Sequence, residues 1–207
     1  MKTLLRIDSS LRVKNSYSRN AGDNFVRAWK ELNPEGSISI REVGTSHIPH
    51  LEQEVLEKFY SAGDTSDRLK LSDQLIAELF GCDEILITVP MYNFGIPSSL
   101  KAYFDLVLRT GKTFRYDEDK AIGLLQNKKA YVLSAMGELD SALPNLVELY
   151  LQQILNFIGI REIYYYSLDG TDDKESVKQQ LNHQKELFTN ILNKKKWNRQ
   201  KKQSKHL

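Results

Sequence analysis

The sequence predicts an α/β protein with a doubly wound, five-stranded parallel sheet and helices on both of its faces. Short apolar runs alternate with longer amphipathic stretches, the pattern of strands that feed helices over a parallel sheet. The run Glu84 to Pro90 is almost continuously apolar, as expected for a central strand covered on both sides. The expected strands are Thr3 to Asp8, Ser37 to Glu42, Glu84 to Pro90, Lys128 to Ser134 and Arg161 to Ser167.

Five helices are expected after these strands, because apolar residues recur there every three or four positions. Pro97 opens one of them at a position where its missing N–H costs nothing. Asp172 and Asp173 precede the last one, where the helix dipole favours negative charge. The expected helices are Ser18 to Leu32, Ser66 to Phe80, Ser98 to Leu108, Pro144 to Phe157 and Asp173 to Asn193.

The long connection from Gly44 to Asp64 interrupts this alternation. It holds a short helical pattern at Gln53 to Tyr60, which we interpret as part of a lid or of a dimer contact.

The 207 residues predict one domain over residues 1–193, followed by a basic tail over residues 194–207. The tail holds seven Lys or Arg and no acid, and outside it 22 basic residues stand against 27 acidic ones, a net charge of −5. The basic character therefore belongs to the tail, and we expect no nucleic-acid binding by the domain. The tail itself is interpreted as a solvated, disordered run, the alternative being attraction to acidic lipids or nucleic acid.

Several absences narrow the class of protein. No apolar run approaches the roughly 20 residues of a membrane-spanning helix, and the N-terminus reaches a charge too early for a secretory signal, so we expect a cytoplasmic protein. Cys82 is the only cysteine and is expected to be structural. The four histidines are scattered without metal-ligand spacing, so no metal is expected.

The loop after the first strand predicts a phosphate site. Residues 9–18 (SSLRVKNSYS) supply hydroxyls, an amide and two cations just before a helix N-terminus, where free N–H groups and the helix dipole favour an anion. No glycine precedes Gly22, so a mononucleotide phosphate fits better than the pyrophosphate of a glycine-rich dinucleotide loop. The alternative is that Ser16 and Ser18 only cap the helix.

The loop after the third strand predicts a site for a flat ring. Residues 90–97 (PMYNFGIP) place aromatic side chains and an amide in a short loop bounded by two prolines. Such a loop can direct backbone N–H groups at the edge of a ring while side chains shield its face. The alternative is a tight turn that buries Tyr92 and Phe94 in the core.

With these motifs the chain resembles the FMN-dependent NADH:quinone oxidoreductase and azoreductase family, in which a PMYNF segment follows the third strand. The resemblance extends to about residue 192 and is also carried by Ser9–Ser10, Ser16 to Ser18, Leu100 to Val107, Thr113 to Tyr116 and Asn156 to Ile160.

The resemblance implies a flavodoxin-like sheet of order 2-1-3-4-5, non-covalent FMN, NADH or NADPH as electron donor, quinones or azo compounds as acceptors, and a homodimer with the flavin near the interface. It further implies that Ser10, Ser16, Tyr17 and Ser18 hold the FMN phosphate. Met91, Tyr92, Asn93 and Phe94 would line the isoalloxazine ring. No side chain is expected to be catalytic, because the flavin carries the chemistry, and successive use of one site by donor and acceptor predicts ping-pong kinetics.

The loop after the fourth strand departs from the family pattern. Ser134, Ala135, Met136 and Gly137 are expected to contact the cofactor, but Met136 stands where the family has a glycine. A side chain there is expected to narrow the pocket or to shift its contact with the ring. Two other functions stay open at this point: a flavodoxin-type electron carrier, and a flavin-free regulatory module on the same fold.

Overall fold

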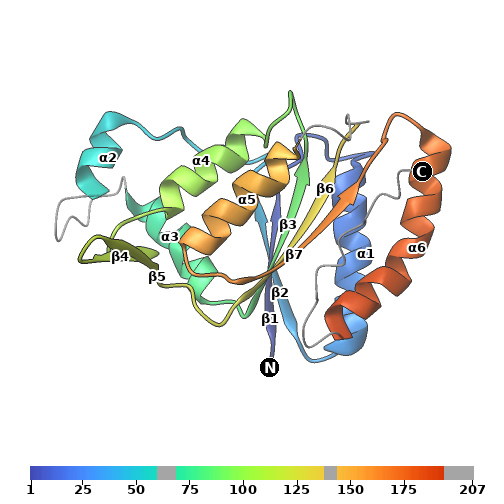
Figure 1. Cartoon of the computed structure of the whole chain (residues 1–207), viewed down its shortest axis with the longest axis horizontal. Helices are drawn as coiled ribbons and strands as arrows, with labels where there is room; N and C mark the ends of the chain where they lie inside the picture. Colours follow the sequence, from blue (N-terminus) through green and yellow to red (C-terminus); the bar gives the residue numbers. More distant parts are fainter. Residues whose placement is uncertain (60–68, 138–143, 194–207) are drawn as a thin grey trace, which may run out of the picture.

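A computed structural model describes residues 1–59, 69–137 and 144–193, and its centre is one parallel sheet (Figure 1). The strands are β1 (Thr3–Asp8), β2 (Ser37–Glu42), β3 (Glu84–Pro90), β6 (Lys129–Ala135) and β7 (Glu162–Leu168). Their order is β2-β1-β3-β6-β7, and every neighbouring pair is parallel. In chain order of the sheet strands this is 2-1-3-4-5, so the predicted doubly wound topology is confirmed.

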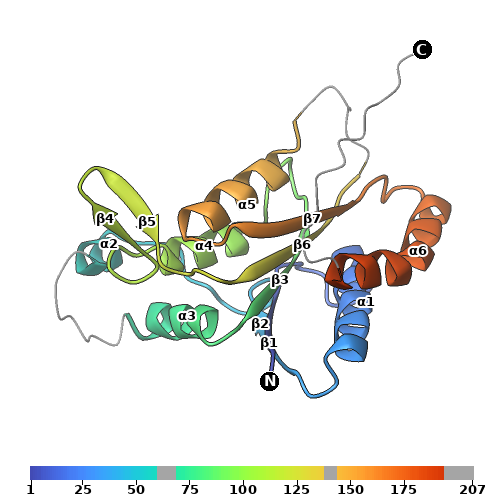
Figure 2. The ribbon, with the colours of Figure 1, turned by 60° about the horizontal axis from the view of Figure 1, so that its bottom comes forward.

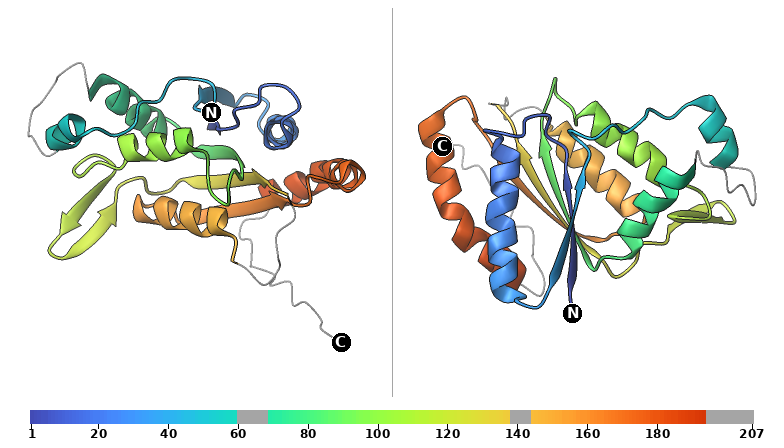
Figure 3. Two further views of the ribbon diagram at one scale, coloured as in Figure 1. Left: turned by 90° about the horizontal axis from the view of Figure 1, so that it is seen from above. Right: turned by 180° about the vertical axis from the view of Figure 1, so that it is seen from behind.

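Helices cover both faces of the sheet (Figures 2 and 3). α1 (Tyr17–Leu32) and α6 (Lys174–Asn193) lie together on one face, and α3 (Lys70–Phe80), α4 (Ser98–Val107) and α5 (Leu146–Phe157) lie on the other. The five predicted helices are confirmed to within a few residues at their ends. The first residues expected for α3, 66–68, lie outside the described residues.

The alternation of side chains along the strands divides the core into two layers. Leu4 and Leu86 point to the face of α1 and α6, where Phe25 of α1 meets Phe188 of α6 with ring centroids 5.4 Å apart. Ile85, Ile87 and Val89 point to the opposite face, against α3, α4 and α5. Each side chain buried in this way stabilises the fold by about 1.5–3 kcal/mol.

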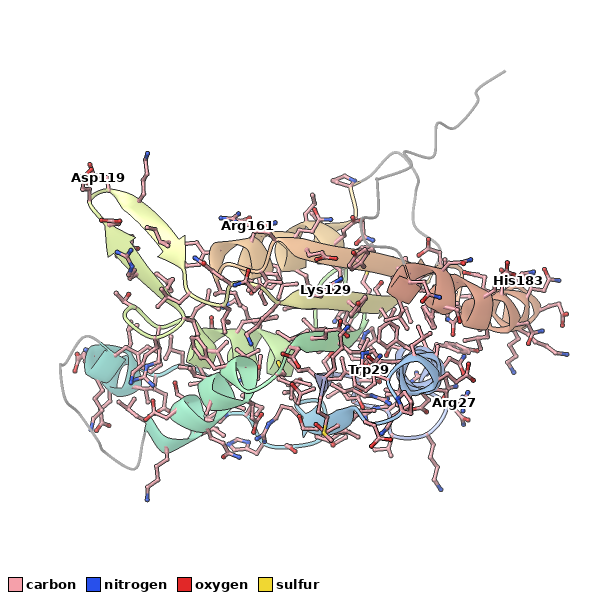
Figure 4. The ribbon with its side chains drawn as sticks, turned by 90° about the horizontal axis from the view of Figure 1, so that it is seen from below. Arg27, Trp29, Asp119, Lys129, Arg161 and His183 are labelled. Carbon is pink, nitrogen blue, oxygen red and sulfur yellow. The ribbon has the colours of Figure 1, made fainter. Side chains whose placement is uncertain are left out.

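A two-stranded antiparallel hairpin, β4 (Phe114–Asp117) with β5 (Lys120–Gly123), was not predicted. Asp119 lies at its tip, away from the rest of the protein (Figure 4). The base of the hairpin is fixed by backbone contact between Gly123 and Gly159: a Cβ atom on Gly123 would lie 2.1 Å from the nitrogen of Gly159. Only glycine permits two backbones to approach so closely.

The long connection after β2 contains α2 (Gln53–Phe59), as the helical pattern predicted, while residues 60–64 lie outside the described residues. The guanidinium of Arg109 lies over the Phe59 ring, 4.8 Å from its centroid, and also donates to Ser72 and Asp73 of α3. This contact places α2 beside the C-terminal end of α4 and anchors it through a buried cation.

Two smaller features bear on the expectations from the sequence. Cys82 is buried, and burial raises the pKa of its thiol to about 11, which suits a structural role. Among the helices of the described residues, none is long and apolar enough to cross a membrane. The basic tail lies outside the described residues.

Candidate active site

A cavity of about 990 Å³ lies at the carboxyl ends of β1 and β3, where open parallel sheets bind their ligands. Its volume is at the upper end of the range for small-molecule and cofactor sites. The walls come from the loops after β1 and β3 and from the N-terminal parts of α4 and α5. They are formed by Leu11, Arg12, Met91, Tyr92, Asn93, Phe94, Gly95, Ile96, Pro97, Ser98, Lys101, Leu146 and Tyr150.

The loop after β3 forms a tight turn on the wall of this cavity. The N–H of Tyr92 donates to the Gly95 carbonyl at 2.9 Å, and the N–H of Gly95 donates back to Tyr92 at 3.0 Å. Asn93 and Phe94 between them have φ of 49° and 64°, as in a type I′ turn. Phe94 is 73% exposed, so the alternative of a buried core turn is wrong for this residue.

This turn leaves backbone donors free. Within the described part of the chain, the N–H groups of Asn93 and Phe94 have no hydrogen-bond partner. A left-handed conformation is unusual for a large aromatic residue and is maintained only where the surroundings enforce it. Here the paired bonds of Tyr92 and Gly95 enforce it. The turn therefore presents two adjacent N–H donors next to an exposed aromatic ring.

The loop after β1 is tied to the loop after β3. The Ser9 hydroxyl donates to the Thr88 carbonyl of β3 at 2.8 Å. The hydroxyls of Ser10 and Tyr92 lie 3.4 Å apart, and Ser10 also accepts from the N–H of Arg12 at 3.2 Å. The predicted polar and aromatic loops are thus brought together in space.

Ser16 caps α1, as one interpretation of the sequence proposed. Its hydroxyl accepts from the N–H of Arg19 at 3.4 Å and lies 3.3 Å from the hydroxyl of Ser18. Within the described residues the N–H groups of Tyr17 and Ser18 have no partner, so capping leaves donors available for an anion. Ser10 and residues 16–18 do not line the cavity but lie in, or directly after, the loop that supplies Leu11 and Arg12 to its wall.

The end of β6 and the residue that follows it turn their side chains inward. Ser134 is fully buried with its hydroxyl 3.4 Å from that of Ser167, and Ala135 is buried and accepts a 2.9 Å bond from the N–H of Met91. Met136 is only 2% exposed, with its sulfur 3.9 Å from Nδ2 of Asn145. Neither these residues nor the half-buried Gly137 line the cavity. In this structure the Met136 side chain packs into the body of the protein and is not among the residues that line the cavity.

Sequence reasoning missed the helical part of the wall. Lys101 of α4 and Leu146 and Tyr150 of α5 line the cavity, and burial raises the pKa of Tyr150 to about 12. The available signal was their place in the first two turns of helices that follow the third and fourth sheet strands, because those turns border the same edge of the sheet as the loops.

A buried ion network lies behind the loop after β1. Arg6 donates to Asp8 at 2.9 Å and to Asp23 at 2.6 Å, while Arg19 donates to Asp8 at 3.3 Å and to both oxygens of Glu42 at 2.7 Å. The hydrogen bonds from Arg19 lower the pKa of the Glu42 carboxyl, so this carboxyl is ionised at neutral pH. Sequence reasoning did not find this network.

A doubly wound parallel sheet of order 2-1-3-4-5, with a candidate ligand site at the carboxyl ends of its first and third strands, is that of the flavodoxin-like class of α/β proteins. A model of the family described as having the flavodoxin-like fold matches residues 1–191. Curated relatives extend the comparison. The FMN-dependent NADH:quinone oxidoreductase of Cellvibrio japonicus (strain Ueda107) is 39% identical over 176 residues, covering 82% of this chain and 88% of the relative. That of Marinomonas sp. (strain MWYL1) is 42% identical over 166 residues, covering 77% and 84%.

The chain therefore belongs to the flavodoxin-like family and, within it, to the group of the FMN-dependent NADH:quinone oxidoreductases. A solved structure shares the fold. The FMN-dependent NADH-azoreductase from Bacillus anthracis str. Ames Ancestor, solved in complex with FMN, superposes with a TM-score of 0.81 at 24% identity, covering 93% of this chain and all of that chain.

Proposed function

We propose that this protein is an FMN-dependent oxidoreductase that uses NADH, or NADPH, to reduce quinones and aromatic azo compounds. The relatives that share about 40% of its residues are named FMN-dependent NADH:quinone oxidoreductases, and a structure of the same fold is an FMN-dependent NADH-azoreductase. FMN, when bound, supplies the hydride transfer between donor and acceptor.

The observation that carries this proposal is the left-handed turn at Asn93 and Phe94. Both residues, whose N–H groups are free, line a cavity large enough for a cofactor, and Met91 and Tyr92 add apolar and aromatic wall. Donors directed at the edge of a heteroaromatic ring stabilise negative charge that develops there. The residues present therefore fit the ring of FMN.

The remaining site residues are assigned to the phosphate and to the flank of the ring. Ser10, Ser16, Tyr17 and Ser18 would hold the phosphate, in support of which the first turn of α1 has free N–H groups beside the two serine hydroxyls. Residues 134–137 would act on the ring through the residues that line the cavity. Ala135 already supports Met91 through its carbonyl, and Met136 packs beneath the surface.

We further propose that donor and acceptor occupy the same part of the cavity in turn, which gives ping-pong kinetics. The chain's own contribution is to orient the ring, to exclude water with Phe94 and Tyr150, and to admit one flat reactant at a time.

The proposed assembly is a homodimer of a single domain over residues 1–193, located in the cytoplasm. Phe94, Leu146 and Leu149 are all more than half exposed and lie on or next to the cavity wall, where a second copy would cover them. The one buried, unpaired thiol is in line with a reducing compartment.

The test is a titration of purified protein with FMN, followed by initial-rate assays with NADH and NADPH against a quinone and an azo dye. We expect flavin binding, continuous oxidation of the nicotinamide beyond one equivalent per flavin only when an acceptor is present, and parallel lines in double-reciprocal plots. A protein that ignores FMN would support the flavin-free regulatory module. Flavin binding without NADH or NADPH oxidation would support the electron carrier.

A further inference from the structure

The loop expected to hold the phosphate is hydrogen-bonded to one buried cation, Arg19. We propose that Arg19 is a positioning residue: clamped by Glu42 and Asp8, it holds the carbonyl of Ser10 away from the anion and thereby fixes the loop for a phosphate monoester. This inference rests on the proposed function, because it assumes that Ser10 and residues 16–18 receive the phosphate of FMN.

Arg19 joins the two ends of the loop. It belongs to the first turn of α1, where its own N–H is bound by the capping Ser16, and its Nη2 donates to the carbonyl of Ser10 at 2.9 Å. The span from Ser10 to Ser16 is thus closed by a single side chain that is 11% exposed. Because Arg19 binds the carbonyl oxygen of Ser10, that oxygen is held toward the guanidinium. In the proposed arrangement it therefore does not face the phosphate, which its negative partial charge would repel.

The guanidinium is itself held from two sides. Both oxygens of Glu42, at the end of β2, accept from it at 2.7 Å, and Asp8, at the end of β1, accepts at 3.3 Å. Such a paired, planar contact fixes the orientation of an arginine more firmly than a single bond does. Both terminal nitrogens of Arg19 are therefore engaged with protein acceptors, and it acts on the phosphate through Ser10.

The clamp is connected to the aromatic side of the site. Asp8 also accepts from the hydroxyl of Thr88 on β3 at 2.6 Å, and Arg6 donates to Asp8 and to the carbonyl of Arg19 at 3.2 Å. A Cβ atom on Gly22 would lie 2.6 Å from Thr88, so α1 is pressed against this cluster. The position of Arg19 is thus set jointly by β1, β2 and β3.

The experiment compares FMN with riboflavin, which has the same ring but no phosphate. We expect Arg19→Lys and Glu42→Gln each to raise the dissociation constant for FMN roughly tenfold, measured by quenching of flavin fluorescence, and to change that for riboflavin by less than about twofold. Glu42 is partly exposed, so Glu42→Gln tests the clamp without emptying a buried site. Thermal melts confirm that each variant is folded.

Arg41→Lys is the matched control. Arg41 also makes a paired contact with both oxygens of a glutamate, Glu78, through Nε and Nη2, but it points from β2 toward α3 and away from the loop. It should leave both dissociation constants unchanged. A purely structural role for Arg19 would weaken both flavins together, and unchanged FMN affinity in the two test variants would also overturn the inference. Equal affinity of the wild-type protein for FMN and riboflavin would instead show that the phosphate contributes nothing to binding. That result would contradict the proposed phosphate site and, with it, the role of Arg19.

Discussion

Asn93 and Phe94 combine a left-handed backbone with a position on the cavity wall, and the two properties can be separated by mutation. Asn tolerates positive φ because its short polar side chain bonds locally, whereas most residues with a Cβ atom resist it. The amide of Asn93 is thus a candidate ring contact, and its backbone is a conformational requirement of the turn.

Asn93→Gly and Asn93→Ala should therefore differ. Both remove the amide and are expected to weaken FMN binding roughly tenfold. Only Asn93→Ala should also lower the free energy of unfolding, by about 1–2 kcal/mol, because glycine adopts φ of 49° without strain. FMN titration and urea unfolding of both variants would check this, and unchanged FMN affinity in both would refute the assignment of the amide.

Met136 should contribute to stability and little to cofactor affinity. Because it is buried against Asn145, Met136→Ala is expected to lower the free energy of unfolding by about 2–5 kcal/mol. The FMN dissociation constant should stay within about threefold of wild type, as measured by fluorescence titration at a temperature where the variant is folded. A large loss of affinity with unchanged stability would place this side chain in the pocket.

The sequence predicted the residue types of the site better than their contacts. The aromatic turn could be predicted because two prolines bound it and a central strand precedes it. Arg19 could not, because its role depends on Asp8 and Glu42, which lie on different strands and meet it only when the sheet is assembled. The two interpretations of Ser16 proved compatible, since a capping hydroxyl leaves neighbouring N–H groups free.

At the scale of elements, the junction of the β4–β5 hairpin with α5 depends on two glycines. Gly159 has φ of 105°, and a Cβ atom there would lie 2.9 Å from the carbonyl of Gly123. Gly159→Ala is therefore expected to lower the free energy of unfolding by about 3 kcal/mol, from strain and collision together, as measured by urea denaturation.

Gly111→Ala separates these two causes. Gly111 has φ of 75°, but nothing lies within 4 Å of the position of its Cβ. Gly111→Ala should therefore lower the free energy of unfolding by only about 1 kcal/mol, because backbone strain is its only cost. Equal losses in the two variants would show that the approach of the backbones is unimportant.

The sheet strands could be predicted almost to the residue, and the hairpin could not, for a physical reason. A buried strand such as β3 must be apolar, whereas β4 buries only Phe114 and β5 only Gly123. Each of the two strands also has only four residues, the lower limit of the length over which a pattern of apolar and polar residues indicates a strand. Their turn also lacks glycine, since Glu118 adopts the positive φ of 54°.

At the scale of the whole molecule, the proposed homodimer makes a specific demand on α5. Leu149 is 52% exposed and does not line the cavity, so Leu149→Glu should disrupt the interface through like charges facing each other across a two-fold axis. Size-exclusion chromatography with light scattering should show a dimer for the wild type and a monomer for the variant. Leu32→Glu, at a 41% exposed position on α1 across the sheet, should remain dimeric. A monomeric wild type would contradict the proposed homodimer.

The pairing of α1 with α6 has a consequence for how the chain is made. Phe25 rests against Phe188, and Asn24 donates to Gln184 at 2.8 Å, yet about 140 residues separate the two helices along the chain. During synthesis the part of α1 that contacts α6 therefore stays exposed until α6 has been made, after nearly all of the other helices and strands. Contacts this distant in sequence slow folding and leave apolar surface open to chaperones or to aggregation.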